Sequence, residues 1–176
     1  MTQAAQQYAQ ALYELARDEN VAKEMLSQLQ TLAKAFREEP DFLRLLASPS
    51  LRKAERRDLL DDSFRHSLHP YLLNFLKILT REGMIRKFSD CCKYFESSYN
   101  ADNGILPVLA YTAQPLTDRQ TEKLTKKMER ITGKTVLLEN KLDPGCLGGV
   151  RLCYDGKQID GTVVSRLAAA GKLLKG

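Results

Sequence analysis

The chain has 176 residues, 43% of them hydrophobic, and a formal net charge of +5 at neutral pH. This length allows one domain or two small ones, and no apolar run reaches the roughly 18 residues that a membrane span needs. The first residues lack the basic and apolar regions of a secretory signal, and four cysteines without disulfide or zinc spacing favour a reduced, cytoplasmic chain.

The first hundred residues contain six segments with the apolar period of a helix. Ser50 is expected to cap the fourth segment, Pro70 to begin the fifth and Gly83 to end it. Short connections between helices are typical of an all-α bundle, which the turn at 102–104 would close. The expected helices are 2–17, about 21–38, a short one around 42–46, about 51–64, 70–82 and 84–100.

The first and fifth helices have more apolar surface than one face of a bundle needs. Ala4 and Ala11 widen the stripe of the first, and apolar residues cover almost the whole circumference of the fifth. Such helices are either central in the core or covered by a partner. The small residues favour a groove for a partner helix, a mode of recognition that needs no catalytic residue. The expected contacts are Tyr8, Ala11, Leu12, Leu15, Leu76, Leu79 and Gly83.

The sixth helix has apolar residues at alternating steps of three and four, the narrow seam of a heptad pattern. Cys92 belongs to that seam. Its neighbour Cys91 points in a different direction, which allows it to be exposed. The fourth helix is highly charged, and its charged residues include Arg52, Lys53, Glu55, Arg56, Arg57 and Asp58.

From Ile105 the pattern becomes that of a small α/β domain with a mixed sheet, in the order β-α-β-β-β-α. The run 105–113 lacks polar alternation, which predicts a strand buried on both faces. Thr117 and Gln120 form a capping box for the helix that follows. The remaining expected elements are a strand at 135–142, a loop at Gly148 and Gly149, a strand at 150–154, a hairpin turn at Asp155 and Gly156, a strand at 157–159, a break at Asp160 and Gly161, and a final helix capped by Thr162.

Several ordered motifs together resemble the delta subunit of F-type ATP synthase, the family that includes the oligomycin-sensitivity-conferring protein. Thr162 stands where that family usually has serine, which keeps the capping hydroxyl, and Val164 stands where a basic residue is common. The motifs are Tyr8 to Ala16, Leu76 to Phe95 through Arg81-Glu82-Gly83, Gly148-Gly149-Val150, Asp155, Ile159 to Val163, and Arg166-Leu167.

The resemblance implies a non-catalytic stator subunit, without cofactor, at the cytoplasmic face of the bacterial inner membrane. Residues 1–104 would bind amphipathic N-terminal helices of the alpha subunits on the catalytic head. Residues 105–176 would bind the peripheral-stalk b subunits and support proton-driven ATP synthesis. Arg166, Lys172 and Lys175 of the last helix would be available to acidic stalk residues.

The strongest alternative of another class is a basic RNA-binding module, because residues 145–148 have the GXXG form of a KH loop. A KH loop joins two helices, whereas this one precedes a strand, so we expect no nucleic acid partner.

An enzyme is disfavoured because no nucleophile–base set is present. His66 and His69 lack a further ligand at metal spacing, and the segment from Gly149 to Lys157 has the wrong spacing for a phosphate-binding loop.

Overall fold

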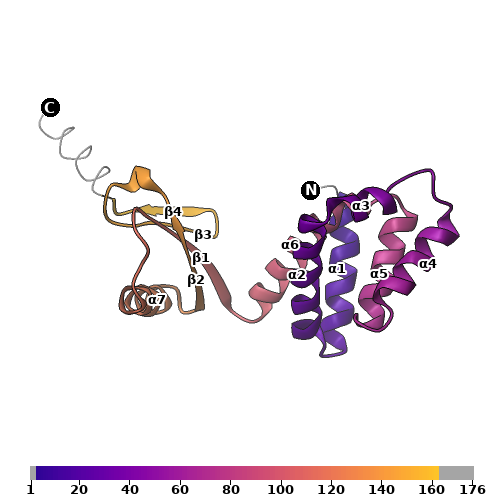
Figure 1. Ribbon diagram of the computed structural model, residues 1–176. Coiled ribbons are helices and arrows are strands. Elements are labelled where there is room, and N and C mark those ends of the chain that lie inside the picture. The colour runs from indigo at the N-terminus through magenta and orange to yellow at the C-terminus, as the bar shows by residue number, and fades with distance from the viewer. Residues whose placement is uncertain (1–2, 163–176) are drawn as a thin grey trace, which may run out of the picture. The chain divides into compact units, whose positions relative to one another are not determined.

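The computed structural model describes residues 3–162 (Figure 1). Six helices precede residue 103, and a four-stranded mixed sheet with one helix follows in the described part, which confirms the expected fold class. The final helix, with Arg166, Lys172 and Lys175, lies outside the described residues. The elements are α1 (Gln3–Asp18), α2 (Ala22–Glu38), α3 (Pro40–Leu46), α4 (Lys53–Phe64), α5 (Pro70–Arg81), η1 (Ile85–Lys87), α6 (Phe88–Asp102), β1 (Ile105–Thr112), α7 (Asp118–Thr132), β2 (Thr135–Leu142), η2 (Pro144–Cys146), β3 (Arg151–Tyr154) and β4 (Lys157–Asp160).

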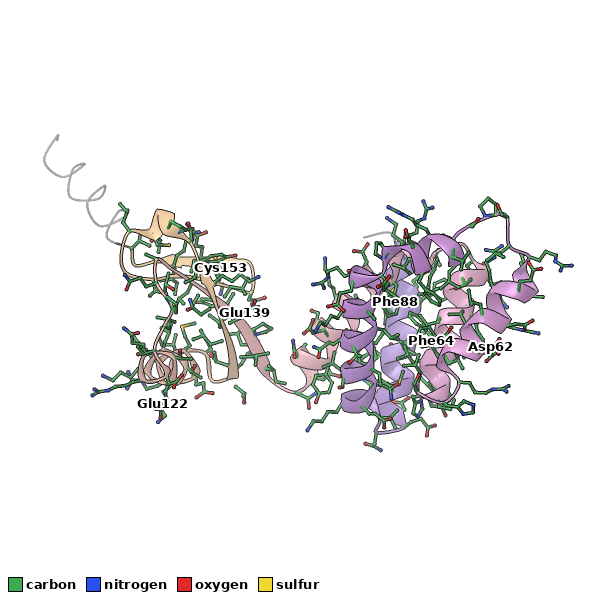
Figure 2. All side chains as sticks on the ribbon, viewed as in Figure 1. Asp62, Phe64, Phe88, Glu122, Glu139 and Cys153 are labelled. Atoms are coloured by element: carbon green, nitrogen blue, oxygen red, sulfur yellow. The ribbon has the colours of Figure 1, made fainter. Side chains whose placement is uncertain are left out.

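Helices α1, α2 and α5 contribute most of the bundle core, with α1 packed against both of the others and α4 packed on α5. Phe36 of α2 makes edge contacts with Phe64 and Phe88, at ring-centroid distances of 6.4 and 5.1 Å. Both partners lie among the helices in Figure 2. These aromatic contacts join α2, α4 and α6 into one core.

Two predicted helix ends are wrong in detail. Ser50 does not cap the fourth helix, which begins at Lys53; instead its backbone N–H donates to the hydroxyl of Ser48. The backbone N–H of Arg52 donates to the Glu55 carboxylate, which satisfies the start of α4 from inside the helix. The segment expected as one helix from residue 84 begins as the short 3-10 helix η1 before α6. Gly83, between α5 and η1, takes a φ of 69°, as the end of a helix requires.

More residues of α6 are buried in the core than the heptad pattern of the sequence indicated. Cys92 lies in the core as expected, but Cys91 is also buried, and its thiol lies 3.5 Å from the backbone carbonyl oxygen of Ala5. Burial raises the pKa of the Cys91 thiol to about 11 and that of Cys92 to about 12. Neither thiol is therefore ionised near neutral pH, so both act as small core side chains.

The sheet has the strand order β2-β1-β3-β4. β1 and β2 run parallel and are connected by α7, whereas β1–β3 and β3–β4 are antiparallel. The capping box at the start of α7 is confirmed, because Thr117 and Gln120 exchange hydrogen bonds. The predicted hairpin is also confirmed, because Asp155 and Gly156 both have positive φ between β3 and β4.

Only one face of β1 is fully buried in the described structure, which corrects the prediction of a strand buried on both faces. Leu106, Val108 and Ala110 point into the core with Met128 of α7. On the opposite face Pro107 is exposed and its neighbours are half-buried. The sequence did not reveal this difference in burial, because β1 has apolar residues on both faces. A strand with one face in solvent usually alternates apolar and polar residues.

The chain divides into two compact units, Met1–Tyr99 and Asn100–Gly176. Each unit has its own hydrophobic core, one formed by the six helices and one by the sheet and α7. The last turn of α6 thus falls in the second unit, and Gly104 takes a φ of 62° before β1 begins.

Candidate partner-binding surfaces

Helix α1 has two apolar stripes that lie one residue apart along its sequence. The first stripe is buried and consists of Ala5, Ala9, Leu12 and Ala16. The second, which we call the α1 stripe, has the same steps of four, three and four and consists of Ala4, Tyr8, Ala11 and Leu15. One residue of offset rotates a position by about 100° around a helix, so the second stripe lies on the flank of the first.

The α1 stripe is largely open to solvent. Leu15 is 40% exposed, Ala4 and Ala11 are exposed, and Tyr8 is half-buried against the core. An apolar helix face left open in this way is typical of a surface that binds another protein. The alanines keep the surface low, so a second helix could approach closely.

The other expected contacts fall into two groups. Leu12, Leu76 and Leu79 are core residues, the two leucines of α5 being completely inaccessible to solvent. Gly83 is exposed just beyond the end of α5. Of the two explanations for the extra apolar surface, a central position in the core accounts for α5, whose buried residues surround much of the helix. Of these two helices, α1 is the one that leaves part of its apolar surface open.

Two glycine-containing loops of the second unit lie against each other although the sequence separates them by eleven residues. The N–H of Gly161 donates to the carbonyl oxygen of Val150 at 3.0 Å. Gly149 has a φ of 82°, and a Cβ at this position would lie 2.5 Å from the carbonyl oxygen of Gly161. The loop after η2 and the loop after β4 therefore form one structure, which we call the glycine contact, that only glycine at 149 permits.

Asp160 is the last residue of β4, one residue beyond the predicted end of that strand, and its side chain forms the turn that follows. Its carboxylate accepts hydrogen bonds from the backbone N–H and the hydroxyl of Thr162. These bonds hold the pKa of the Asp160 carboxyl below its usual value, the backbone bond contributing most. Thr162 is 4% exposed, so the chain is anchored where the described residues end.

Polar contacts not predicted from the sequence hold the same region of the sheet. Arg151 of β3 forms an ion pair with Asp143 and lies 4.9 Å from the ring centroid of Tyr111. Asn140 of β2 donates to the carbonyl oxygen of Ala110 and accepts from the N–H of Leu116, which ties β1, β2 and the approach to α7 together. The spacing of these residues carries no recognisable motif, because each pairs with a residue that is distant in sequence or on another strand.

The GXXG segment at residues 145–148 does not have the setting of a KH loop. It follows β2, forms part of η2 and leads into β3, so it connects two strands instead of two helices. Leu147 in this loop has a φ of 48° and is 77% exposed. This geometry removes the observation on which the RNA-binding alternative depended.

An open apolar helix face on the bundle is typical of a protein that acts by binding other proteins. No helix within residues 3–162 is long and apolar enough to cross a membrane. The family model described as "ATP synthase delta (OSCP) subunit" matches residues 4–174. The chain belongs to this family.

Relatives and a solved structure agree with this assignment. The ATP synthase delta subunit of Alkaliphilus metalliredigens is 30% identical over 163 residues, covering 93% of this chain and 91% of that protein. That of Clostridium kluyveri is 31% identical over 167 residues, covering 95% and 92%. A chain in the cryo-EM structure of the Toxoplasma gondii mitochondrial ATP synthase hexamer has a similar fold, with a TM-score of 0.74, 19% identity and coverage of 100% and 99%.

Family membership answers the question of function class. The protein is a non-catalytic structural subunit of ATP synthase, a stator component that links the F1 head to the peripheral stalk. Its role in ATP synthesis coupled to proton transport is therefore mechanical, and its chemistry is that of binding surfaces.

Proposed function

We propose that the helical domain, residues 1–104, binds an amphipathic N-terminal helix of an alpha subunit along the α1 stripe. The C-terminal domain, residues 105–176, binds the b subunits of the peripheral stalk at the cytoplasmic face of the bacterial membrane. The protein then connects the catalytic head to the stalk and resists rotation of the head while the rotor turns.

The observation that carries the first half of this proposal is the open apolar face of α1. Ala11 and Leu15 are exposed while Leu12, between them in sequence, is buried. A partner helix that covers the open residues would remove apolar area from water, worth roughly 25 cal/mol for each Å² buried. Leu76 and Leu79 belong to the same core cluster as the buried residues of α1, and Gly83, which is exposed beyond the end of α5, is proposed as a further contact.

The second half is supported by the construction of the glycine contact. It fixes the loops at Gly148–Gly149 and Asp160–Gly161 against one another and so sets where the chain leaves β4. Arg166, Lys172 and Lys175 follow this point in the sequence, and we propose that they bind acidic residues of the stalk. Charges at the rim of an interface mostly set the association rate and its sensitivity to salt.

The experiment for the head contact is substitution Ala11→Trp, with binding measured by calorimetry against a peptide from the alpha-subunit N-terminus. The indole would occupy the space into which the partner helix packs, so binding should weaken by about 1–3 kcal/mol, the usual cost of overpacking an interface. Because Ala11 is exposed, the bundle should melt at an unchanged temperature.

The matched control is Ala35→Trp, which adds the same side chain at an exposed alanine of α2. It should leave peptide affinity unchanged. Equal affinity of the Ala11→Trp variant and the unmodified protein, with both folded, would place the alpha-subunit contact elsewhere on the bundle.

A further inference from the structure

A pocket of about 400 Å³ lies between α4 and α5, and its lining shares no residue with the α1 stripe. This is within the range of sites that hold small molecules. Its lining contains no Asp or Glu, but five basic side chains: Lys53, Arg56, Arg57, Lys77 and Arg81.

The positive charge of this pocket is only partly balanced. Lys77, Arg57 and Arg81 each pair with a neighbouring carboxylate that is not part of the lining. Among the described residues, no carboxylate lies within 4.0 Å of the cationic groups of Lys53 or Arg56. Lys53 is exposed and Arg56 half-buried, with one guanidinium N–H donating to the Leu51 carbonyl oxygen.

The same wall includes the first turn of α4, since Lys53 and Ala54 are its first two residues. The N-terminus of a helix carries a partial positive charge, which favours anions nearby. The last turn of α5 also lines the pocket, through Ile78, Thr80 and Arg81, and the partial negative charge of a helix C-terminus opposes that of the α4 N-terminus. The basic side chains therefore supply most of the positive charge.

The rest of the lining is not uniformly polar. Ala54, Leu60 and Ile78 form an apolar part, and Leu60 is completely inaccessible to solvent. Thr80 also lines the pocket, and its buried hydroxyl has no hydrogen-bond partner among residues 3–162. A buried hydroxyl without a partner is unfavourable, and an acceptor brought into the pocket could relieve it.

We propose that this pocket binds a small phosphate ester that combines a multiply charged end with a planar or apolar group. Guanidinium groups bind phosphate through paired N–H donors and also stack on planar rings, so Arg56 and Arg57 suit both parts of such a ligand. The basic side chains come from both helices, with Lys53, Arg56 and Arg57 on α4 and Lys77 and Arg81 on α5, so a small anion in the pocket would face them from two sides. The proposal concerns a different surface from the α1 stripe and does not depend on it.

The test uses the full-length protein labelled with ¹⁵N and titrated in magnesium-free, low-salt buffer with ATP, pyrophosphate or adenosine. ATP carries both parts of the proposed ligand, and the other two probes carry one each. We expect ATP to produce saturable shifts of backbone amide resonances in residues 53–57 and 74–81. Pyrophosphate and adenosine should bind at least about fivefold more weakly.

The variant Lys53→Gln with Arg56→Gln removes the two cations without a carboxylate partner and should weaken ATP binding at least about tenfold. The control Lys23→Gln with Arg37→Gln removes the same charge from exposed positions on α2 and should bind ATP normally. If the first variant does not fold, Asn74→Asp offers a milder test, because Asn74 is an exposed residue of the same lining. It should also weaken ATP binding.

Three results would overturn the proposal. The first is the absence of saturable shifts in the pocket. The second is equal weakening by both double variants, which would show a general effect of charge. The third is tight binding of a polyglutamate peptide at the pocket while ATP leaves it unchanged, which would assign the pocket to an acidic protein segment.

Discussion

At the scale of single residues, one ion pair joins α4 to α5. The Asp61 carboxylate lies 2.6 Å from the Lys77 ammonium group, and the two side chains are 22% and 26% exposed. The hydrogen bond from Lys77 lowers the pKa of Asp61 below its usual value. The pair therefore stabilises the folded protein where Asp61 is ionised, and the contribution is lost as the pH falls through the lowered pKa.

This predicts a pH-dependent effect of Asp61→Asn on the free energy of unfolding. Near pH 7 the variant should be less stable than the unmodified protein. The difference should shrink as the pH falls below about 4, the ordinary pKa of an aspartate, because the native carboxylate then becomes protonated as well. Urea unfolding monitored by circular dichroism at several pH values would measure it.

The control is Asp62→Asn at the adjacent residue, which lies on the surface of the bundle in Figure 2 and has no ion pair within the described residues. Its effect on stability should be small at every pH. A constant destabilisation by Asp61→Asn down to pH 2 would mean that the side chain contributes by packing and not by charge.

At the scale of elements, the glycine contact shows how a loop can be as constrained as a strand. Gly149 must adopt a φ of 82° and also pass close to the backbone of Gly161 and Thr162. Asp155 and Gly156 meet a simpler requirement, since the hairpin between β3 and β4 needs only positive φ.

We predict that Gly149→Ala destabilises the C-terminal domain by about 2–3 kcal/mol, because it adds a steric clash to an unfavourable backbone conformation. Gly156→Ala is the matched control: it has a φ of 69°, but nothing lies within 4 Å of an added Cβ. It should cost about 1 kcal/mol, the conformational part alone. Equal effects of the two substitutions on urea unfolding would show that the loop at Gly149 moves aside.

At the scale of the whole molecule, each unit has a separate core. The two clusters of buried hydrophobic residues have no residue in common. The cluster of the first unit ends at Phe95, and that of the second begins at Leu106. This arrangement is consistent with two domains that fold on their own and carry separate binding functions.

We therefore predict that fragments 1–104 and 105–176 each fold when expressed alone. The first should be helical by circular dichroism and bind the alpha-subunit peptide, and the second should bind a segment of the b subunit. Cleavage of the intact protein by a dilute protease should begin near 102–104, where Gly104 has positive φ between α6 and β1.

A fragment 1–104 that is unfolded in solution would show that the domain boundary is misplaced. Binding of the stalk segment by the helical fragment, with the alpha-subunit peptide bound by the other, would reverse the assignment of functions to the two domains.

The sequence by itself determined the features that depend on neighbouring residues. Apolar periodicity located all six helices of the bundle and the strands that the structure describes. Turn and capping chemistry predicted the cap at Thr117 and the hairpin at Asp155. The ordered motifs from Tyr8 onward were sufficient to indicate the family. These features could be predicted because local geometry and hydrogen bonding decide them.

Only the tertiary structure decided which apolar surfaces are covered. Leu79 and Leu15 are equally apolar and lie in helices that are both more apolar than one core face needs, yet one is buried and the other is 40% exposed. Cys91 is buried because the backbone of α1 packs over it, and the approach of Gly149 to Gly161 exists only when β3 and β4 pair. Periodicity shows which residues share a face of an element, but the packing of distant elements determines what that face meets.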